Sequence, residues 1–155
     1  MKVELKKLKT YPRLSKETTA FNTELWIDGK KAADVENNGN GGPSRLRFND
    51  PKVAVKFAAY VKSLPPHPSE HGYGPLEMSE DLFVSLLVEK AEFDNRLRRL
   101  AKSNVLFSLP GEKVGEVVKL NSIGEVRTVK FSAGDRDGAV KYVLAKYPNA
   151  VIHNV

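Results

Sequence analysis

The chain has 155 residues, about the size of one domain, and its composition excludes several classes of site. Cysteine is absent, so disulfides, thiolate metal sites and thiol nucleophiles are excluded, and we expect no metal or cofactor. Lys and Arg (25) outnumber Asp and Glu (19), and the net charge of +6 favours an anionic partner, namely nucleic acid, a nucleotide or an acidic protein surface, although it also serves solubility. The charged N-terminus is not an export signal, and no apolar run approaches the ~20 residues of a membrane span. We therefore expect a cytoplasmic protein with no membrane association.

Strand signals come first in chain order. Val3, Leu5 and Leu8 alternate with lysines over residues 2–10, and the phase slips once, which predicts a strand with a bulge or an end between Leu5 and Leu8. A polar connector follows.

A β-hairpin is predicted over about residues 20–37. Alternate residues from Phe21 to Ile27 fall on one face, and Asp28-Gly29 is a hairpin signal because glycine accepts a positive φ. Trp26 lies on the opposite face, either as a contact residue or packed beneath a helix. After the break at residues 37–43, residues 44–48 predict another short strand.

Two longer helices are predicted next. The first begins with Asp50 as its cap and Pro51 in its first turn. Its apolar stripe comprises Val53, Ala54, Phe57, Ala58, Val61 and Leu64. A Pro/Gly-rich loop follows, and the second helix is expected from about Ser79 to Lys102. One face of that helix is lined by Leu82, Leu86, Phe93, Leu97 and Leu100.

The last third predicts a β-hairpin–α–β unit. Residues 105–107 form a short apolar strand, and residues 115–130 are expected to form a hairpin around Asn121-Ser122. Asp135 or Asp137 caps a helix that ends before Pro148, and residues 151–152 form a final strand. The apolar residues of this helix are Val140, Val143, Leu144 and Tyr147.

These elements predict an α+β fold with antiparallel β-hairpins, two longer helices and the C-terminal unit just described. We expect residues 1–155 to form a single domain with one shared core. The alternative is a pair of lobes, residues 1–64 and 76–155, joined by the Pro/Gly-rich loop.

Two sets of residues resemble a group of small proteins that is common in phages and other mobile elements. The first set comprises Leu14-Ser15-Lys16-Glu17-Thr18, Phe21, Asp28-Gly29-Lys30-Lys31 and Asn37-x-Gly39-x-Gly41-Gly42. The second comprises Leu100, Leu106-Phe107, Gly115, Arg127-Thr128-Val129-Lys130, Lys146-Tyr147 and Asn154. The group has no assigned function, so the resemblance implies no activity. Proteins of such origin often antagonise host defences by masking a host protein or sequestering a nucleotide signal.

A loop rich in glycine and asparagine is the leading candidate site. Positive φ angles at glycine and asparagine would let successive N–H groups converge on an anion, and the arginines on the next strand would add charge. The residues of this ligand or partner site are Asn37, Asn38, Gly39, Asn40, Gly41, Gly42, Arg45 and Arg47. The loop lacks the features of a Walker loop or a dinucleotide fingerprint. The alternative of a simple turn between two strands stays open.

A basic helix end is the second candidate, as a contact for nucleic-acid phosphates. Its residues are Arg96, Arg98, Arg99 and Lys102. The alternative is a solvated face that complements the helix dipole.

Three other features give little support for a metal site or a catalytic site. His67-Pro68-Ser69-Glu70-His71 matches the H-x-x-E-H zinc pattern, but its prolines forbid the helix that zinc binding requires. Asp135-x-Asp137-Gly138 fits a helix cap better than a calcium loop. His153, expected at a frayed terminus, is a poor candidate for a catalytic base.

These features lead to three hypotheses. The first is a non-enzymatic binding protein that captures a host protein or a small, nucleotide-like anion. The second is a nucleic-acid-binding accessory protein that uses the basic helix end. The third is a hydrolase or transferase, which lacks a recognisable catalytic constellation in the sequence.

Overall fold

A computed structural model shows an α+β fold with antiparallel sheets, which confirms the predicted class. The structure describes residues 1–68, 74–115, 117–119, 122–132 and 134–153. The chain divides into two compact units, Met1–Val88 and Glu89–Val155. Their boundary falls inside the second long helix and not in the Pro/Gly-rich loop. The single domain with one shared core stays a prediction.

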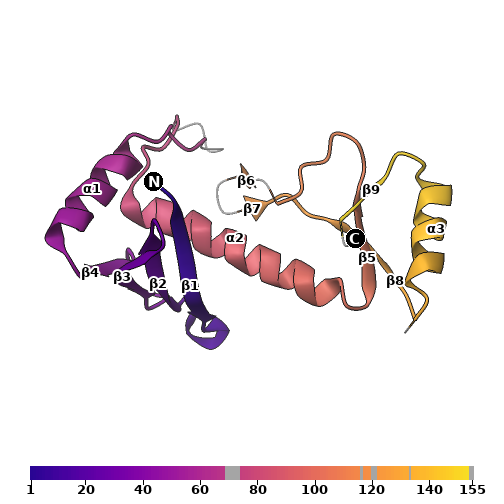
Figure 1. The fold of residues 1–155 in the computed structure, drawn as a ribbon, viewed down its shortest axis with the longest axis horizontal. Helices are drawn as coiled ribbons and strands as arrows, with labels where there is room; N and C mark the ends of the chain where they lie inside the picture. Colours follow the sequence, from indigo (N-terminus) through magenta and orange to yellow (C-terminus); the bar gives the residue numbers. More distant parts are fainter. Residues whose placement is uncertain (69–73, 116, 120–121, 133, 154–155) are drawn as a thin grey trace. The chain divides into compact units, whose positions relative to one another are not determined.

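The first unit is built on a four-stranded antiparallel sheet in which consecutive strands are neighbours (Figure 1). Its strands are β1 (Val3–Thr10), β2 (Phe21–Ile27), β3 (Lys30–Asn37) and β4 (Arg45–Phe48). The predicted bulge in β1 is confirmed, because the β1–β2 register shifts between Lys6 and Lys9, and Lys7 has a φ of +54°. The predicted hairpin turn is also confirmed, with positive φ at Asp28 and Gly29.

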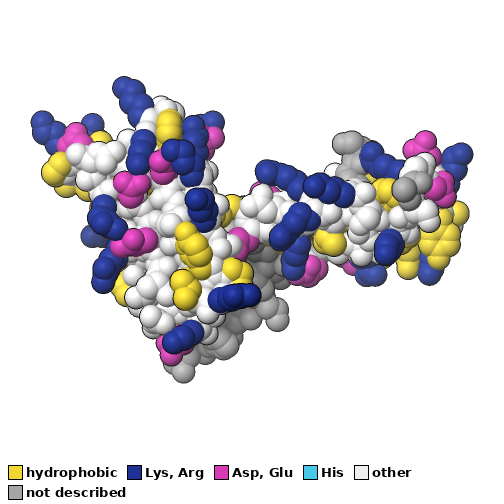
Figure 2. Space-filling view, turned by 90° about the horizontal axis from the view of Figure 1, so that it is seen from below, with side chains coloured by type: hydrophobic (Ala, Val, Ile, Leu, Met, Phe, Trp, Pro, Cys, Tyr) yellow, Lys and Arg dark blue, Asp and Glu magenta, His cyan; other side chains and the backbone are white. Residues whose placement is uncertain are grey.

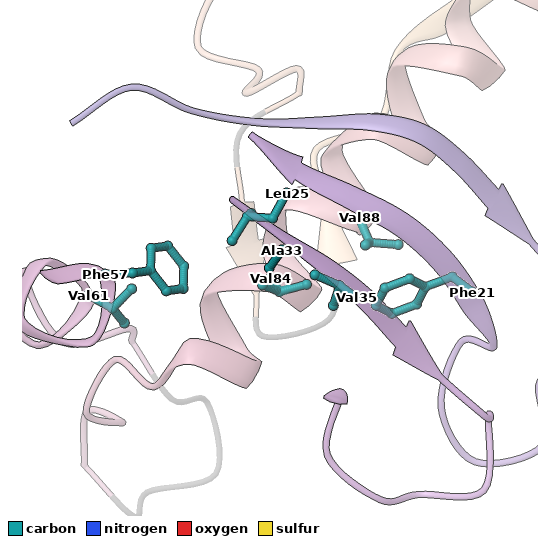
Figure 3. Close-up of a cluster of buried hydrophobic side chains, with 8 residues drawn as sticks. All are labelled: Phe21, Leu25, Ala33, Val35, Phe57, Val61, Val84 and Val88. Carbon is teal, nitrogen blue, oxygen red and sulfur yellow. The ribbon is translucent and has the colours of Figure 1, made fainter. Parts of the chain in front are cut away.

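Two helices bury the inner face of this sheet. Helix α1 (Pro51–Lys62) begins as predicted, since the Asp50 side chain accepts the N–H of Lys52 at 2.8 Å. Helix α2 (Glu80–Leu100) contributes its first turns to the same core. Figure 3 shows side chains from β2, β3, α1 and α2 pointing toward one another. They are Phe21, Leu25, Ala33, Val35, Phe57, Val61, Val84 and Val88.

The buried side of α2 differs from the prediction in its first turns, although the predicted Phe93 is buried. Val84 and Val88 are fully buried, whereas the expected residues Leu82 and Leu86 are only partly buried. The segment from Leu82 to Val88 is apolar at every position except Ser85, so its periodicity selects no single face. The sheet and α1 decide which side is covered.

The second unit has a smaller sheet in the order β8-β5-β9, which packs against one helix. Its elements are β5 (Asn104–Ser108), β8 (Arg127–Lys130), β9 (Val151–Ile152) and α3 (Arg136–Lys146). The core consists of Val105, Phe107, Ala139 and Val143, and the ring of Tyr147 stacks on that of Phe107. A separate two-stranded sheet pairs β6 (Val117–Lys119) with β7 (Ser122–Ile123).

The structure confirms some of the expectations for this unit and corrects others. The predicted hairpin over residues 115–130 is confirmed only in its first part: β6 and β7 pair as a short antiparallel hairpin, whereas β8 pairs with β5. Asn121, in the expected turn, lies outside the described residues. Leu144 is exposed and not part of the apolar face of α3. Asp135 occupies the N-cap position of α3, as predicted, although its side chain makes no capping hydrogen bond.

Candidate functional site

The glycine–asparagine loop, residues 37–44, docks onto residues 11–18, which contain the short helix η1 (Pro12–Leu14). Figure 1 shows the connection between β1 and β2, which carries η1, at one end of the sheet. The carbonyl oxygen of Gly39 accepts hydrogen bonds of 3.0 to 3.3 Å from three successive N–H groups, those of Lys16, Glu17 and Thr18. We call residues 11–18 and 37–44 together the double loop.

Asn37 is the polar centre of the double loop. Its Oδ1 accepts hydrogen bonds from Thr18 Oγ1 at 3.0 Å and from the N–H of Gly39 at 2.8 Å. Its Nδ2 donates to the carbonyl oxygen of Gly42 at 3.0 Å and to Ser44 Oγ at 3.2 Å. The buried amide of Asn37 thus satisfies groups at both ends of its own loop and joins the loop to the neighbouring segment.

Close packing requires glycine at position 39, and a positive φ favours it at position 41 as well. Gly39 and Gly41 have φ angles of +81° and +82°. A Cβ at Gly39 would collide with the carbonyl oxygen of Leu14, and one at Gly41 would collide with the Glu17 carboxylate. Gly42 has neither a positive φ nor a close neighbour at its Cβ position. The glycines therefore serve the docking of the two segments as well as the turn.

Several N–H groups of the loop already have partners within the protein. The N–H of Asn40 donates to Asn38 Oδ1 at 3.1 Å, and that of Gly41 donates to Thr18 Oγ1 at 3.3 Å. The N–H of Ser44 donates to Asp81 Oδ1, in the first turn of α2, at 2.7 Å. Donors that are used internally are not free to hold an anion, so the side chains and surface of the loop are what it offers a partner.

The double loop presents apolar side chains among polar groups. Leu14 and Tyr11 are 58% and 37% exposed. The exposed residues of the segment 37–44 are Asn38, Asn40, Gly41, Gly42 and Pro43. An apolar centre with a polar rim is the usual composition of a protein–protein contact.

The two loop arginines lie on the outer face of the sheet, the face opposite the α1–α2 core. Arg47 pairs with Glu36 at 2.8 Å. Arg45 is exposed and has no acidic partner among the residues that the structure describes. The predicted loop residues and arginines thus belong to two adjoining surfaces, the double loop and the outer face.

The strand register arranges the outer face in parallel rows, which the sequence analysis did not identify. One of them comprises Glu4, Trp26 and Lys31, and two others span all four strands. The first of these two rows runs across β1, β2, β3 and β4 as Lys9, Asn22, Glu36 and Arg45. The second row runs in the same direction as Lys6, Glu24, Asp34 and Arg47. Both rows have cations on the outer strands and hydrogen-bond acceptors between them. The alternation of charged and apolar residues along each strand was the available signal, but the pairing of the strands was needed to align the rows.

Glu24 lies at the centre of a charge network on this face. Its carboxylate accepts from Lys7 Nζ at 2.9 Å and from Trp26 Nε1 at 3.0 Å, and it pairs with Lys31 Nζ at 3.3 Å. The hydrogen bond from Lys7, followed by that from Trp26, lowers the pKa of Glu24 to about 2. Lys6 Nζ stands 3.6 Å from the Trp26 ring centroid, so this aromatic side chain is covered by a cation on the outer face.

A shallow depression of about 300 Å³ lies between the two rows. It is lined by residues of all four strands, namely Lys7, Lys9, Asn22, Thr23, Glu24, Asp34, Val35, Glu36 and Arg47. Figure 2 shows the side chains of the first unit with Lys and Arg interspersed with Asp and Glu.

Two of the four cations at the basic end of α2 already have partners within the protein. Arg96 pairs with Glu125 at 2.8 Å and lies over the Phe93 ring, and Arg98 donates to Asn95 Oδ1 at 3.3 Å. Arg99 and Lys102 are exposed and form no ion pair with any described residue.

The structure brings together a serine and a histidine that the sequence did not identify as a pair. Ser108 Oγ and His153 Nε2 lie 2.8 Å apart. The N–H of His153 donates to the Leu106 carbonyl oxygen, so the expectation of a frayed position is wrong for this residue. Ser108 is only 5% exposed, and the following N–H, that of Leu109, is bonded to Glu112. A nucleophile needs access and a free oxyanion donor, so we assign the pair a structural role.

The zinc-like motif is described only in part. His67 is buried and pairs with Leu76 in an isolated β-bridge, while Glu70 and His71 lie outside the described residues. Within the described ranges, no three His, Asp or Glu side chains are grouped closely enough to hold a metal ion. None of the helices in those ranges is both long and apolar enough to cross a membrane. Comparison with protein-family models, with curated proteins and with solved structures found no match.

Proposed function

We propose that this chain is a non-enzymatic binding protein of a phage or another mobile element that captures a host protein through the double loop. The observation that carries this proposal is the rigid anchoring of an exposed loop by the Gly39 carbonyl and the Asn37 amide. Such capture would mask a host protein and in this way counter host defence, as the resemblance to mobile-element proteins suggests.

Rigidity favours binding because a loop that is already ordered loses little conformational entropy when a partner arrives. The double loop meets this condition through hydrogen bonds and glycine contacts that hold both segments. Exposed Leu14 and Tyr11 would supply the apolar centre of the contact, and the loop asparagines would supply its polar rim.

A protein partner is favoured over a small, nucleotide-like anion. Gly39, Asn40, Gly41 and Ser44 each use their N–H group within the protein. Two carboxylates, those of Glu17 and Asp81, also adjoin the loop and would repel an anion.

Site-specific photo-crosslinking tests the proposal. Benzoylphenylalanine would replace Asn40 in one variant and the exposed Val55 of α1 in a control, and both would be expressed in host cells. We expect one host protein to crosslink at position 40 and not at position 55. Adding Gly42→Trp to the position-40 variant should prevent this crosslink. Gly42 has open space at its Cβ position, so this change should cover the surface of the loop with little effect on the docking of the two segments.

Two outcomes would contradict protein capture. Equal crosslinking at both positions would show that the contact is not specific to the double loop. Native mass spectrometry that finds a bound nucleotide-sized mass, absent from Gly42→Trp, would assign the loop to a small ligand instead.

Nucleic-acid binding by the end of α2 is the second candidate. It is favoured by the exposed cations Arg99 and Lys102, which lack acidic partners among the described residues. The charge reversal Arg98→Glu with Arg99→Glu should abolish nucleic-acid binding and leave crosslinking at position 40 unchanged. Binding that survives this reversal would remove this candidate.

A further inference from the structure

We infer that Asn40 is a site of spontaneous covalent modification, at which the side-chain amide is lost as ammonia and an aspartyl or isoaspartyl residue is left. Water is the only reactant besides the protein. This inference concerns the chemistry of the chain itself and does not depend on capture of a protein by the double loop. It rests on the sequence of the loop and on the hydrogen bonds that hold its N–H groups.

The reaction needs an asparagine whose side chain can be reached by the backbone nitrogen of the next residue. That nitrogen gives its proton to the solvent and attacks the asparagine Cγ; the new C–N bond forms, and the Cγ–Nδ2 bond breaks with release of ammonia. Water then opens the cyclic imide at either carbonyl and leaves one new carboxyl group. Glycine is the best following residue because it has no Cβ to hinder the approach. The chain has two Asn-Gly pairs, Asn38-Gly39 and Asn40-Gly41.

The structure protects the first pair. Gly39 is buried and its N–H donates to Asn37 Oδ1 at 2.8 Å, so the nitrogen that would attack is shielded from water and held by a short hydrogen bond. The Asn38 side chain is held as well, because its Oδ1 accepts the N–H of Asn40 at 3.1 Å. Freeing a buried N–H from its acceptor costs free energy. We therefore expect Asn38 to react slowly, although glycine follows it too.

The second pair lacks this protection. Asn40 and Gly41 are both exposed, and the Asn40 side chain makes no hydrogen bond with any described residue. The N–H of Gly41 donates to Thr18 Oγ1 at 3.3 Å, which is at the long end of the range for such bonds. Both the attacking nitrogen and the amide that it attacks are thus open to water. Asn40 is therefore the site that the fold leaves reactive.

The modification would change the surface of the double loop. It places a negative charge at position 40, next to Gly41, against which the Glu17 carboxylate already lies. The isoaspartyl product also adds a methylene group to the main chain between Gly39 and Gly41. If the double loop captures a protein, as proposed above, the surface that meets this partner would change in charge and shape with the age of the protein.

The test incubates the purified full chain at physiological temperature and pH 8 and follows its mass over several days. Brief digestion with trypsin, which cleaves after Lys31 and Arg45, releases residues 32–45 as one peptide that holds both Asn-Gly pairs. Each conversion adds one mass unit, and fragmentation of the peptide locates it at position 38 or 40. We expect Asn40 to convert about ten times faster than Asn38 or more, the factor expected when one of two N–H groups is buried and hydrogen-bonded.

Unfolding provides the matched control. In concentrated urea neither pair is protected, so the two asparagines of the same chain should convert at similar rates. Asn40→Gln should abolish the mass gain at position 40 of the folded protein, because the longer side chain would have to form a less favourable, larger ring. Asn38→Gln should leave the mass gain at position 40 unchanged.

The inference is overturned if the folded protein converts Asn38 as fast as Asn40 or faster, or if Asn40 gains no mass in the folded protein. A rate that does not rise between pH 6 and pH 8 would also contradict it, because the attacking nitrogen must lose its proton. The readout is the mass of the isolated protein, so its outcome is separate from that of crosslinking to a host protein.

Discussion

The hydroxyl of Thr18 donates a hydrogen bond of 3.0 Å to the side-chain oxygen of Asn37, and this contact joins two segments that are 19 residues apart. Thr18 and Asn37 both fall in the first of the two sets of residues on which the expected resemblance to mobile-element proteins rests. The same two segments meet again where the Gly39 carbonyl oxygen accepts hydrogen bonds from backbone N–H groups and where Gly41 lies against Glu17. The motif therefore describes a docked pair of segments and not an isolated loop.

Replacing Asn37 should destabilise the first unit. Asn37→Ala removes hydrogen bonds to four partners, and we expect the free energy of unfolding to fall by about 2–3 kcal/mol because buried groups lose their partners. Urea unfolding followed by the fluorescence of Trp26, the single tryptophan, measures this in the sheet. Asn38→Ala is the control, since that exposed side chain accepts one N–H, and it should cost less than about 1 kcal/mol. Equal losses would show that Asn37 is not the centre of the double loop.

Gly39 and Gly42, two glycines of the same loop, should respond in opposite ways to replacement by alanine. Gly39→Ala places a Cβ against the Leu14 carbonyl oxygen at a positive φ, and we expect a loss of about 2 kcal/mol or more in the free energy of unfolding. Gly42→Ala meets no neighbour and should be neutral or slightly stabilising. Thermal unfolding of the two variants side by side measures the difference. A tolerated alanine at position 39 would contradict the docking of the segments.

Glu24 should contribute stability that depends on acid pH. Its pKa is lowered in the folded state from 4.5 to about 2 by Lys7, Trp26 and Lys31, so its stabilising effect is complete above pH 4.5 and is lost as the pH falls toward 2. We expect Glu24→Gln to be less stable than the natural protein at pH 7, with the difference shrinking between about pH 4.5 and 2. Urea midpoints across that range measure it. A difference that stays constant with pH would show that the charge of Glu24 is not what stabilises the sheet.

Glu89 should affect the pH dependence of stability in the opposite direction from Glu24. Burial, and then the charge of Glu92, raises the pKa of Glu89, and its Oε2 is buried without a hydrogen-bond partner among the described residues. The cost of ionising it is absent below pH 4.5 and grows as the pH rises through the raised pKa. Glu89→Gln should therefore raise the melting temperature at pH 7 and leave it unchanged at pH 4. Calorimetry at both pH values tests this, and a lower melting temperature at pH 7 would refute it.

Local features of the fold could be predicted because local chemistry determines them. Asp50 and Pro51 start a helix wherever their neighbours permit it, and Asp28-Gly29 turns the chain through its own backbone angles. The slip in alternation between Leu5 and Leu8 likewise indicated a bulge. None of these features requires a distant residue.

Partners distant in sequence could not be predicted. The burial of Val84 and Val88, the pairing of β8 with β5 and the contact of Ser44 with Asp81 each depend on which surfaces meet in space. For the candidate site, the sequence located the glycine–asparagine loop and its two arginines but not the segment that anchors it or the rows of the outer face.

The sequence by itself determined the class of fold, the turns, the helix start and the positions of the charged residues, because these follow from backbone preferences and composition. Only the tertiary structure decided that Gly39 docks against residues 16–18 and that Lys9 and Arg45 end one row across four strands. The physical reason is that hydrogen bonding and strand register join residues far apart in the chain, and a change of register by a single residue would turn every side chain of a strand to the other face.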